Sequence, residues 1–155
     1  APEGDIGEDH DPETHLIPII LQVALDQRKE VLVFGDDYPT PDGSCIRDYI
    51  HVMDLANAHV AALNKLEENQ GLCVHNIGTG RGCSVLEMIN AFERATGQKV
   101  AYEIDARRTG DAPAVYADAS QAGSELNWQA EYGLEDMCRD AWNWQQKNPD
   151  GYGSG

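Results

Sequence analysis

Basic residues are scarce in this sequence. Only 11 Lys and Arg stand against 27 Asp and Glu, which gives a formal net charge of −16 at pH 7. The acidic residues are scattered along the chain, so a polyanion would be repelled over most of the surface. The composition therefore excludes nucleic acid and anionic membrane surfaces as partners. Any anionic ligand has to be held by a few arginines that cluster locally.

Cysteine pairs and long apolar runs are also lacking. The four cysteines, Cys45, Cys73, Cys83 and Cys138, form no Cys-x-x-Cys pair, and none stands beside a histidine at the spacing of metal ligands. No apolar run approaches the roughly 20 residues that span a bilayer, and no signal peptide opens the chain. We expect reduced, mostly buried thiols, no metal site, and a cytoplasmic protein.

Both ends of the chain have the composition of loops. Residues 1–13 are polar and rich in Gly, Pro and Asp, and no initiator Met or leading strand precedes them. We therefore expect a loop over 1–13 that continues from a missing N-terminal domain, a folded domain over 14–150, and a disordered tail over 151–155. A content of 41% hydrophobic residues is enough for one domain with a core.

Between the ends, helical and strand patterns alternate. The expected helices cover residues 16–24, 54–68, 85–96, 120–126 and 134–146, and the expected strands cover 31–35, 46–51, 73–77 and 100–104. The helix over 54–68 has one apolar face, formed by Leu55, Ala58, Ala62 and Leu66. Trp128, Trp142 and Trp144 are expected to fill core. This order predicts a small α/β domain of α+β-like character.

Residues 78–82 read Gly-Thr-Gly-Arg-Gly and stand between an expected strand and a helix, as a phosphate-binding loop would. The third glycine of the dinucleotide fingerprint is lacking, and no strand ending in an acid follows about twenty residues later. Ser84 and Glu87 have the spacing of a capping box, and Gly97 ends the helix that it opens. A tight turn into a capped helix is therefore favoured over a nucleotide-binding loop.

The most specific segment runs from Phe34 to His59 and reads FGDDYPTPDGSCIRDYIHVMDLANAH. It is preceded by GEDHDPETHLIP and followed by NIGTGRGCSVLEMI and RRTGDAPAVYADASQAGSELNW. In this order the motifs resemble the UDP-glucose 4-epimerases, members of the extended short-chain dehydrogenase/reductase superfamily. The resemblance extends from about Gly7 to Tyr152, which is nearly the whole chain.

The resemblance implies a two-part enzyme of which this chain is one part. In that family an N-terminal Rossmann domain binds NAD through a glycine-rich turn and supplies a Tyr-x-x-x-Lys pair, and a smaller C-terminal domain closes over the UDP-sugar. Neither sequence feature occurs here. We therefore expect the C-terminal substrate-binding domain of an NAD-dependent UDP-hexose 4-epimerase, inactive alone, with no cofactor and no catalytic residue of its own. The face that meets the missing Rossmann domain is expected to be apolar and exposed, which would permit self-association.

The resemblance also implies two residues that hold the substrate diphosphate. Arg47, in Ile-Arg-Asp-Tyr, and Arg108, in Arg-Arg-Thr-Gly-Asp, match the family's two diphosphate-binding arginines. A guanidinium suits this ligand, because it donates two parallel hydrogen bonds to phosphate oxygens. The alternative is that each arginine pairs on the surface with Asp48 or Asp111, an arrangement worth only about 0–1 kcal/mol.

Further positions match residues around the nucleoside and the sugar. Asp111 matches an acid that accepts a hydrogen bond from the ribose hydroxyls; alternatively, it is an Asp-turn acceptor. Leu32 and Phe34 match positions that line the uracil pocket, with a role as core strand residues as the alternative. Val115 matches a site that is either a bulky tyrosine or a small residue, so we hypothesise that the parent enzyme accepts UDP-N-acetylhexosamines as well as UDP-glucose and UDP-galactose.

Leu16 matches the start of the helix that touches the diphosphate and sugar, where free backbone N–H groups favour an anion. The preceding Thr14 and His15 depart from the commoner Asn-Asn form, so a role for the His15 side chain stays open. The remaining histidines are interpreted as structural or exposed, with no acid-base or metal cluster around them. These are His10, His51, His59 and His75.

Two other functions remain as alternatives. One is a part of a related nucleotide-sugar dehydratase or decarboxylase, against which the close fit of IRDYIHVMDLA argues. The other is a non-catalytic module that binds nucleotide-sugars or another protein.

Overall fold

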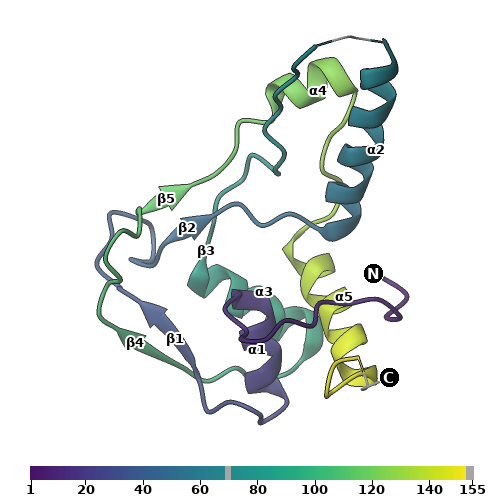
Figure 1. The fold of residues 1–155 in the computed structure, drawn as a ribbon. Coiled ribbons are helices and arrows are strands. Elements are labelled where there is room, and N and C mark those ends of the chain that lie inside the picture. Colours follow the sequence, from purple (N-terminus) through teal and green to yellow (C-terminus); the bar gives the residue numbers. More distant parts are fainter. Residues whose placement is uncertain (69–70, 153–155) are drawn as a thin grey trace.

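The computed structural model describes residues 1–68 and 71–152 and shows a mixed α/β fold (Figure 1). The helices are α1 (Leu16–Ala24), α2 (Val52–Glu68), α3 (Val85–Thr96), α4 (Ser120–Leu126) and α5 (Leu134–Lys147). The strands are β1 (Val31–Phe34), β2 (Ile46–Arg47), β3 (Cys83–Ser84), β4 (Tyr102–Asp105) and β5 (Ala114–Val115). The five expected helices are thus confirmed, with small shifts at their ends.

The main core lies where α1, α3 and α5 pack against β1. Each of these elements buries one apolar face, as amphipathic periodicity requires. Ile20 of α1, Val31 of β1 and Phe92 of α3 are each at most 1% exposed. The Phe92 ring meets the Trp142 ring of α5 edge to face, with centroids 5.8 Å apart. As expected, Trp128 and Trp144 are also buried.

The start of α3 has the capping box that its sequence predicts. The Ser84 hydroxyl accepts a hydrogen bond from the Glu87 backbone N–H at 3.0 Å, and the Ser84 N–H donates to the Glu87 carboxylate at 2.7 Å. Gly97 ends the helix in the left-handed region, with φ of 73°, which favours glycine.

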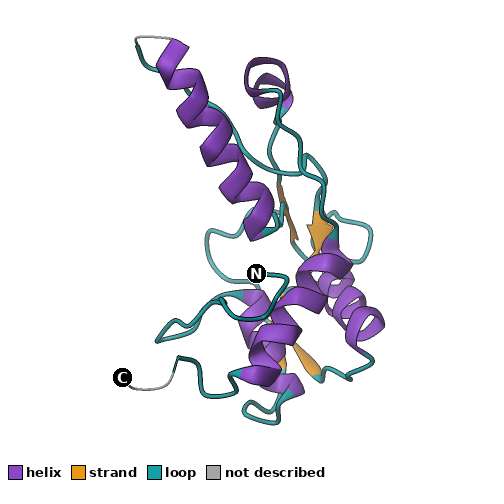
Figure 2. Cartoon of the chain, turned by 90° about the vertical axis from the view of Figure 1, so that its right-hand side faces the viewer, coloured by secondary structure: helices purple, strands orange, loops and turns teal. Residues whose placement is uncertain are grey.

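A second, smaller core joins α2 to α4. Ala58, Ala122 and Leu126 are buried in it, and the Trp128 indole N–H donates to the Asp54 carbonyl at 3.0 Å. Figure 2 shows α2 extending away from the three helices of the main core. Because the short helix α4 covers only part of α2, Leu55 and Leu66 remain 36% and 52% exposed. The apolar face expected on this helix is thus buried at Ala58 and exposed at Leu55 and Leu66.

The strands form two small sheets. β1 and β4 pair in parallel, with Val31 opposite Tyr102 and Phe34 opposite Asp105. In the other sheet β2 is central, antiparallel to β3 and parallel to β5. The short strands β3 and β5 were not predicted, because two residues carry no periodic signal.

Three expected strands differ from the structure. The strand expected over 46–51 is reduced to Ile46–Arg47. The one expected over 100–104 lies at Tyr102–Asp105, so a strand that ends in an acid does follow the glycine turn, contrary to the sequence interpretation. Residues 73–77 form no strand at all. A strand needs a hydrogen-bonding neighbour, and the described residues of the chain place none beside this segment.

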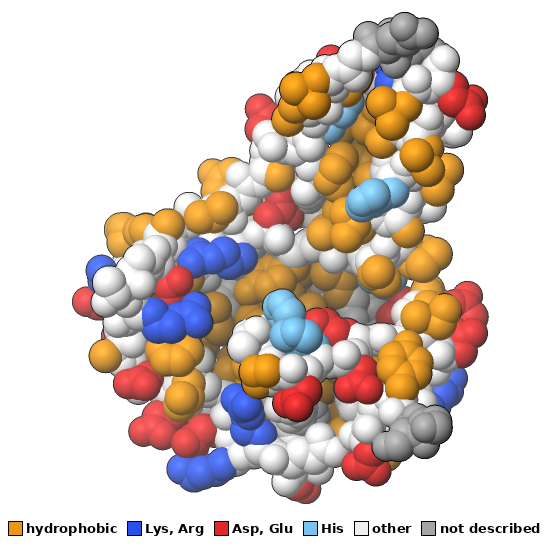
Figure 3. All heavy atoms as spheres, viewed as in Figure 1, with side chains coloured by type: hydrophobic (Ala, Val, Ile, Leu, Met, Phe, Trp, Pro, Cys, Tyr) orange, Lys and Arg blue, Asp and Glu red, His pale blue; other side chains and the backbone are white. Residues whose placement is uncertain are grey.

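An exposed group of large apolar side chains lies on α2 and the segment that follows it, and we call it the α2 surface. It comprises Val52, Leu55, Val60, Leu63, Leu66, Leu72 and Val74. Leu63 is 63% exposed and Leu72 is 92% exposed. Hydrophobic side chains are visible along this lobe in the space-filling view (Figure 3). Exposed apolar surface of this extent is typical of an interface.

The two ends of the described chain lie against each other. Residues 1–15 form no helix or strand, as expected for a loop, and Asn143 of α5 donates to the Pro2 carbonyl at 2.8 Å. The Tyr152 hydroxyl lies 3.0 Å from both the backbone N and the carbonyl O of Gly7. Of the expected tail, Gly151 and Tyr152 are thus part of the folded structure, and 153–155 lie outside the described residues.

All four cysteines are free thiols, and Cys73 is the exposed one. Burial raises the pKa of Cys83 and of Cys138 to about 12, so both stay protonated at neutral pH. None of the helices in the described part of the chain is long and apolar enough to cross a membrane.

Candidate functional site

Arg47 and Arg108 converge on the carboxylate of Asp111. Arg47 Nη2 lies 3.5 Å from Asp111 Oδ1, and Arg108 Nε lies 3.0 Å from Asp111 Oδ2. The Asp111 side chain is 18% exposed, whereas Arg47 and Arg108 are 30% and 60% exposed. The structure therefore brings together two guanidinium groups that the sequence separates widely.

Backbone pairing positions Arg47. It lies on β2 opposite Val115 of β5, and its Nη1 donates to the carbonyls of Ile46 at 2.8 Å and Ala112 at 2.9 Å. Both bonds turn the guanidinium toward the loop that carries Asp111. The alternative expectation, that each arginine pairs with a nearby carboxylate, is therefore what the structure shows, and Asp111 is the partner of both arginines.

The end of β1 forms the other side of the site. Arg108 Cζ stands 4.6 Å from the centroid of the Phe34 ring, a cation–π contact. Side chains alternate along a strand, so Leu32 and Phe34 face away from the buried Val31 and Val33. Leu32 is 42% exposed, so the alternative that it is a core residue is wrong, and Phe34 is half-buried.

Two further predicted site residues lie in different surroundings. Val115 is 54% exposed and is the register partner of Arg47, so it lies beside Arg47. Leu16 begins α1 and packs, partly buried, against the main core. Among the described contacts, none joins Leu16 or Leu32 to the arginine pair.

The Asp48 carboxylate binds the backbone of the glycine turn formed by residues 78–82. Its carboxylate accepts backbone N–H groups from Thr79 at 3.0 Å, Gly80 at 3.1 Å and Ala117 at 3.1 Å, and it accepts the Thr79 hydroxyl. Burial by itself raises the pKa of this carboxyl, but these hydrogen bonds outweigh it, so the pKa lies below its ordinary value. A Cβ at Gly78 would stand 2.5 Å from Asp48 Oδ2, so only glycine fits there.

The backbone groups of this turn are thus already bound to a carboxylate. A phosphate loop needs them free to donate to its ligand. The interpretation of residues 78–82 as a tight turn before a capped helix is confirmed, and the turn does not fit a dinucleotide phosphate.

The sequence did not indicate the neighbouring cluster of Arg107, Asp37 and Tyr38. The Arg107 guanidinium donates to the Asp37 carboxylate and lies 4.1 Å from the centroid of the Tyr38 ring. Nothing in the doubled arginine of RRTGD distinguishes which of its members turns toward Asp111. Which of the two arginines reaches Asp111 depends on the path of the chain after β4.

Three of the other histidines were expected to be structural or exposed; His51 is buried and His59 is exposed. His51 lies 3.1 Å from Asp140 Oδ2 through Nε2, and accepts the Met53 N–H on Nδ1 at 3.0 Å. His59 lies 2.7 Å from the Leu55 carbonyl, and His75 lies 2.9 Å from the Glu125 carboxylate. His10 is exposed, as expected, but Glu13 and His15 lie beside it, whereas no group of potential metal ligands was expected there.

Comparison with known protein families shows the family to which the chain belongs. Residues 3–141 match a family described as GDP-mannose 4,6 dehydratase. The chain belongs to this family. Within it, the chain is similar to UDP-glucose 4-epimerases, and it corresponds to the C-terminal part of their structures. The resemblance predicted from the motifs is therefore confirmed.

Three relatives illustrate the match. A bifunctional UDP-glucose and UDP-xylose 4-epimerase of Pisum sativum is 56% identical over 152 residues, covering 96% of this chain and 43% of the relative. The Bifidobacterium longum UDP-glucose 4-epimerase in complex with NAD+ and UDP has a TM-score of 0.93 and 49% identity, covering 98% of this chain and 45% of that one. A UDP-Glc/GlcNAc 4-epimerase of Campylobacter jejuni has a TM-score of 0.78 and 40% identity, covering 91% of this chain and 43% of that one. The chain thus spans less than half the length of these relatives.

Proposed function

We propose that this chain is the UDP-sugar-binding part of a UDP-hexose 4-epimerase. The convergence of Arg47 and Arg108 on one carboxylate carries the proposal. Two guanidiniums around one anionic group suit a diphosphate, whose oxygens can accept bidentate hydrogen bonds from both. On binding, the diphosphate takes the place of the Asp111 carboxylate between the arginines.

The remaining predicted residues have roles around this diphosphate. Asp111, once released, accepts a hydrogen bond from the ribose hydroxyls. Leu32 and Phe34 present an outward apolar face at the end of β1, which suits a flat uracil ring. Leu16 begins α1, whose first N–H groups favour an anionic group nearby. Val115 faces the sugar beside Arg47.

Part of the binding pocket comes from elsewhere. Two clefts of about 770 Å³ and 410 Å³ in the described structure are lined by residues other than Arg47 and Arg108. We infer that the missing N-terminal Rossmann domain closes the pocket and covers the α2 surface. The exposed segment 73–77 would gain a hydrogen-bonding neighbour in the same interface. When that domain is absent, the α2 surface also favours self-association.

The chemistry of the full-length protein is assigned to that missing part. Asp48 already occupies the amides of the glycine turn, so the NAD of the parent enzyme belongs outside this chain. NAD would there supply the reversible hydride chemistry of inversion at sugar C4. This chain contributes binding energy remote from the reacting carbon, which retains the intermediate. We therefore expect the chain alone to be inactive and the full-length protein to be a cytoplasmic isomerase of galactose metabolism.

Calorimetric titration with UDP tests the proposal. Arg47→Ala and Arg108→Ala should each weaken UDP binding about tenfold or more, because a hydrogen bond to a charged group contributes about 1.5–3 kcal/mol. Arg94→Ala is the matched control, since Arg94 is an exposed arginine paired with Glu135 on the far helices. Equal binding by all four proteins would show that the arginines hold no nucleotide.

A dehydratase remains the second candidate, because the matched family is described by that activity. Analysis of the products that the full-length protein forms from a UDP-sugar distinguishes an epimerase from a dehydratase. An epimerase interconverts UDP-glucose and UDP-galactose without loss of water, whereas a dehydratase forms a 4-keto-6-deoxy sugar.

A further inference from the structure

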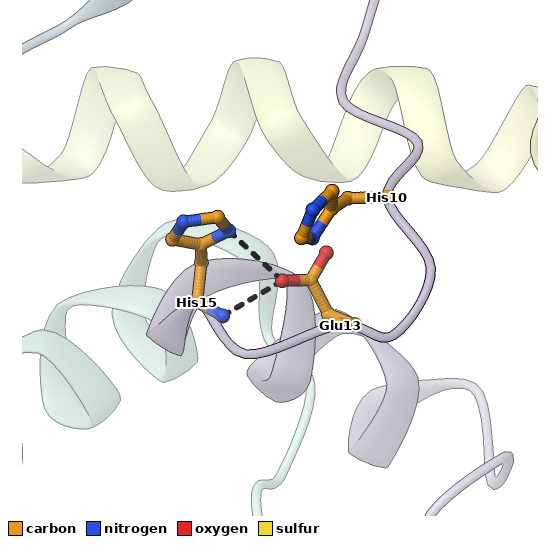
Figure 4. Close-up of side chains that lie close together, drawn as sticks. All are labelled: His10, Glu13 and His15. Atoms are coloured by element: carbon orange, nitrogen blue, oxygen red, sulfur yellow. Dashed lines mark hydrogen bonds and ion pairs between the residues drawn. The ribbon is translucent and has the colours of Figure 1, made fainter.

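His10, Glu13 and His15 form a cluster of potential metal ligands in the segment before α1. One donor atom of each residue lies within 4.8 Å of the donor atoms of the other two. The two imidazole rings have centroids 5.4 Å apart. In Figure 4 the His10 ring lies over the Glu13 carboxylate, on the same side of the segment as the His15 ring. The three side chains therefore face one common space.

The backbone positions the central carboxylate. Glu13 Oε1 accepts the N–H groups of Thr14 and His15, both at 2.7 Å, and its side chain is 7% exposed. His15 is the N-cap residue of α1, which fixes its backbone at the start of the helix. Two of the three potential ligands are therefore held in place before any ion binds, which lowers the ordering cost of binding.

A fourth group adds negative charge at the same point. His15 Nδ1 lies 2.9 Å from Glu8 Oε1 and 3.0 Å from Glu13 Oε1. His15 Nδ1 thus faces two carboxylates, which repel each other. A dipositive ion beside Nδ1 would neutralise both. The chain's net charge of −16 favours cations further.

We propose that His10, Glu13 and His15 bind a divalent transition-metal ion of the zinc class. Two imidazoles and a carboxylate are a common set of three protein ligands for zinc, with a water molecule or another ligand in the fourth position. Imidazole nitrogen favours zinc, nickel and copper over magnesium and calcium, which prefer oxygen. The site shares no residue with the arginine cluster, and His15 directly precedes Leu16 at the start of α1.

Titration of the untagged 155-residue chain with Zn2+ tests this proposal. All proteins carry Cys73→Ser, because the exposed Cys73 thiol would itself bind zinc. The parent protein should bind one ion per chain, and Co2+ at the same site should show the visible absorption of a four-coordinate complex. His10→Ala and His15→Ala should each weaken Zn2+ binding at least about tenfold, since loss of even an outer-shell partner costs 10–100-fold.

His59→Ala is the matched control, because His59 is an exposed histidine on α2, outside the cluster. It should bind Zn2+ like the parent, and Ca2+ should bind to none of the proteins at this site. Glu13→Gln keeps the shape of the side chain and removes its charge, so reduced Zn2+ binding with an unchanged melting temperature assigns the effect to ligation. The proposal is overturned if His10→Ala and His15→Ala bind Zn2+ as tightly as His59→Ala.

Discussion

The carboxylate of Asp111 is the ionic partner of Arg47, from which it is 64 positions distant in the sequence. The same carboxylate accepts a hydrogen bond from Arg108 Nε. The two arginines are thereby held side by side, and their charges are partly compensated. Under the proposed function, an incoming diphosphate would compete with this carboxylate for the same donors.

Asp111→Asn should therefore separate the two proposed roles of Asp111. Without the negative charge, inorganic pyrophosphate should bind severalfold more tightly, since an exposed ion pair contributes up to about 1 kcal/mol. UDP should gain less than pyrophosphate, because its ribose loses a charged acceptor. Calorimetry with both ligands measures the difference, and Asp37→Asn, beside Arg107, is the control. Weaker pyrophosphate binding by the Asn variant would contradict a competing carboxylate.

Val115 should determine which sugars the full-length protein accepts. It is exposed beside Arg47, and a larger side chain there would crowd the substituent at sugar C2. Val115→Tyr should lower kcat/KM for UDP-GlcNAc at least about tenfold while UDP-galactose changes little, because steric exclusion of this kind is worth about 1–3 kcal/mol. Val115→Ala is the control that leaves the space open. A parent enzyme that turns over UDP-galactose but no UDP-GlcNAc would refute the hypothesis.

Asp48→Asn should destabilise the chain at neutral pH and much less in acid. Replacing the ionised acceptor should lower the free energy of unfolding by about 1–3 kcal/mol, a typical cost when hydrogen bonds to a charged group are weakened. The hydrogen bonds hold the folded-state pKa below the ordinary value of 3.8, so the stabilisation is complete above that value. It is lost as the pH falls through the lower pKa of the folded state.

Urea unfolding of both proteins across this pH range measures the effect, with the exposed Asp5→Asn as control. A difference in stability that stays constant with pH would mean that the charge of Asp48 is not responsible.

Leu63→Ala should distinguish the α2 surface from ordinary exposed residues. In this chain alone the change should alter the free energy of unfolding by no more than about 0.5 kcal/mol, as at most surface positions. In the full-length protein, where we infer that the surface is covered, the same change should cost about 2–5 kcal/mol. Denaturant unfolding in both contexts measures this, and the buried Ile89→Ala should be costly in both. An equally small effect in both contexts would show that Leu63 stays uncovered.

Structural features that depend on residues close together in the sequence were predictable, and features that depend on pairing with a distant segment were not. The helix α3 and its capping box follow from Ser84, Glu87 and Gly97, because helical hydrogen bonds and caps join residues a few positions apart. The segment 73–77 has the composition of a strand but forms none among the described residues. Its hydrogen bonds depend on a neighbour that the local sequence does not supply.

By itself, the sequence determined the family, the helices, the acidic balance and the identities of most candidate ligand residues. Only the tertiary structure decided that Arg47 and Arg108 share Asp111, that Asp48 fills the glycine turn, and that His10 lies beside His15. Residue types and helical periodicity are local properties of a chain. An ion pair, a buried acceptor or a ligand cluster forms only where the strands and loops bring its members within a few ångströms.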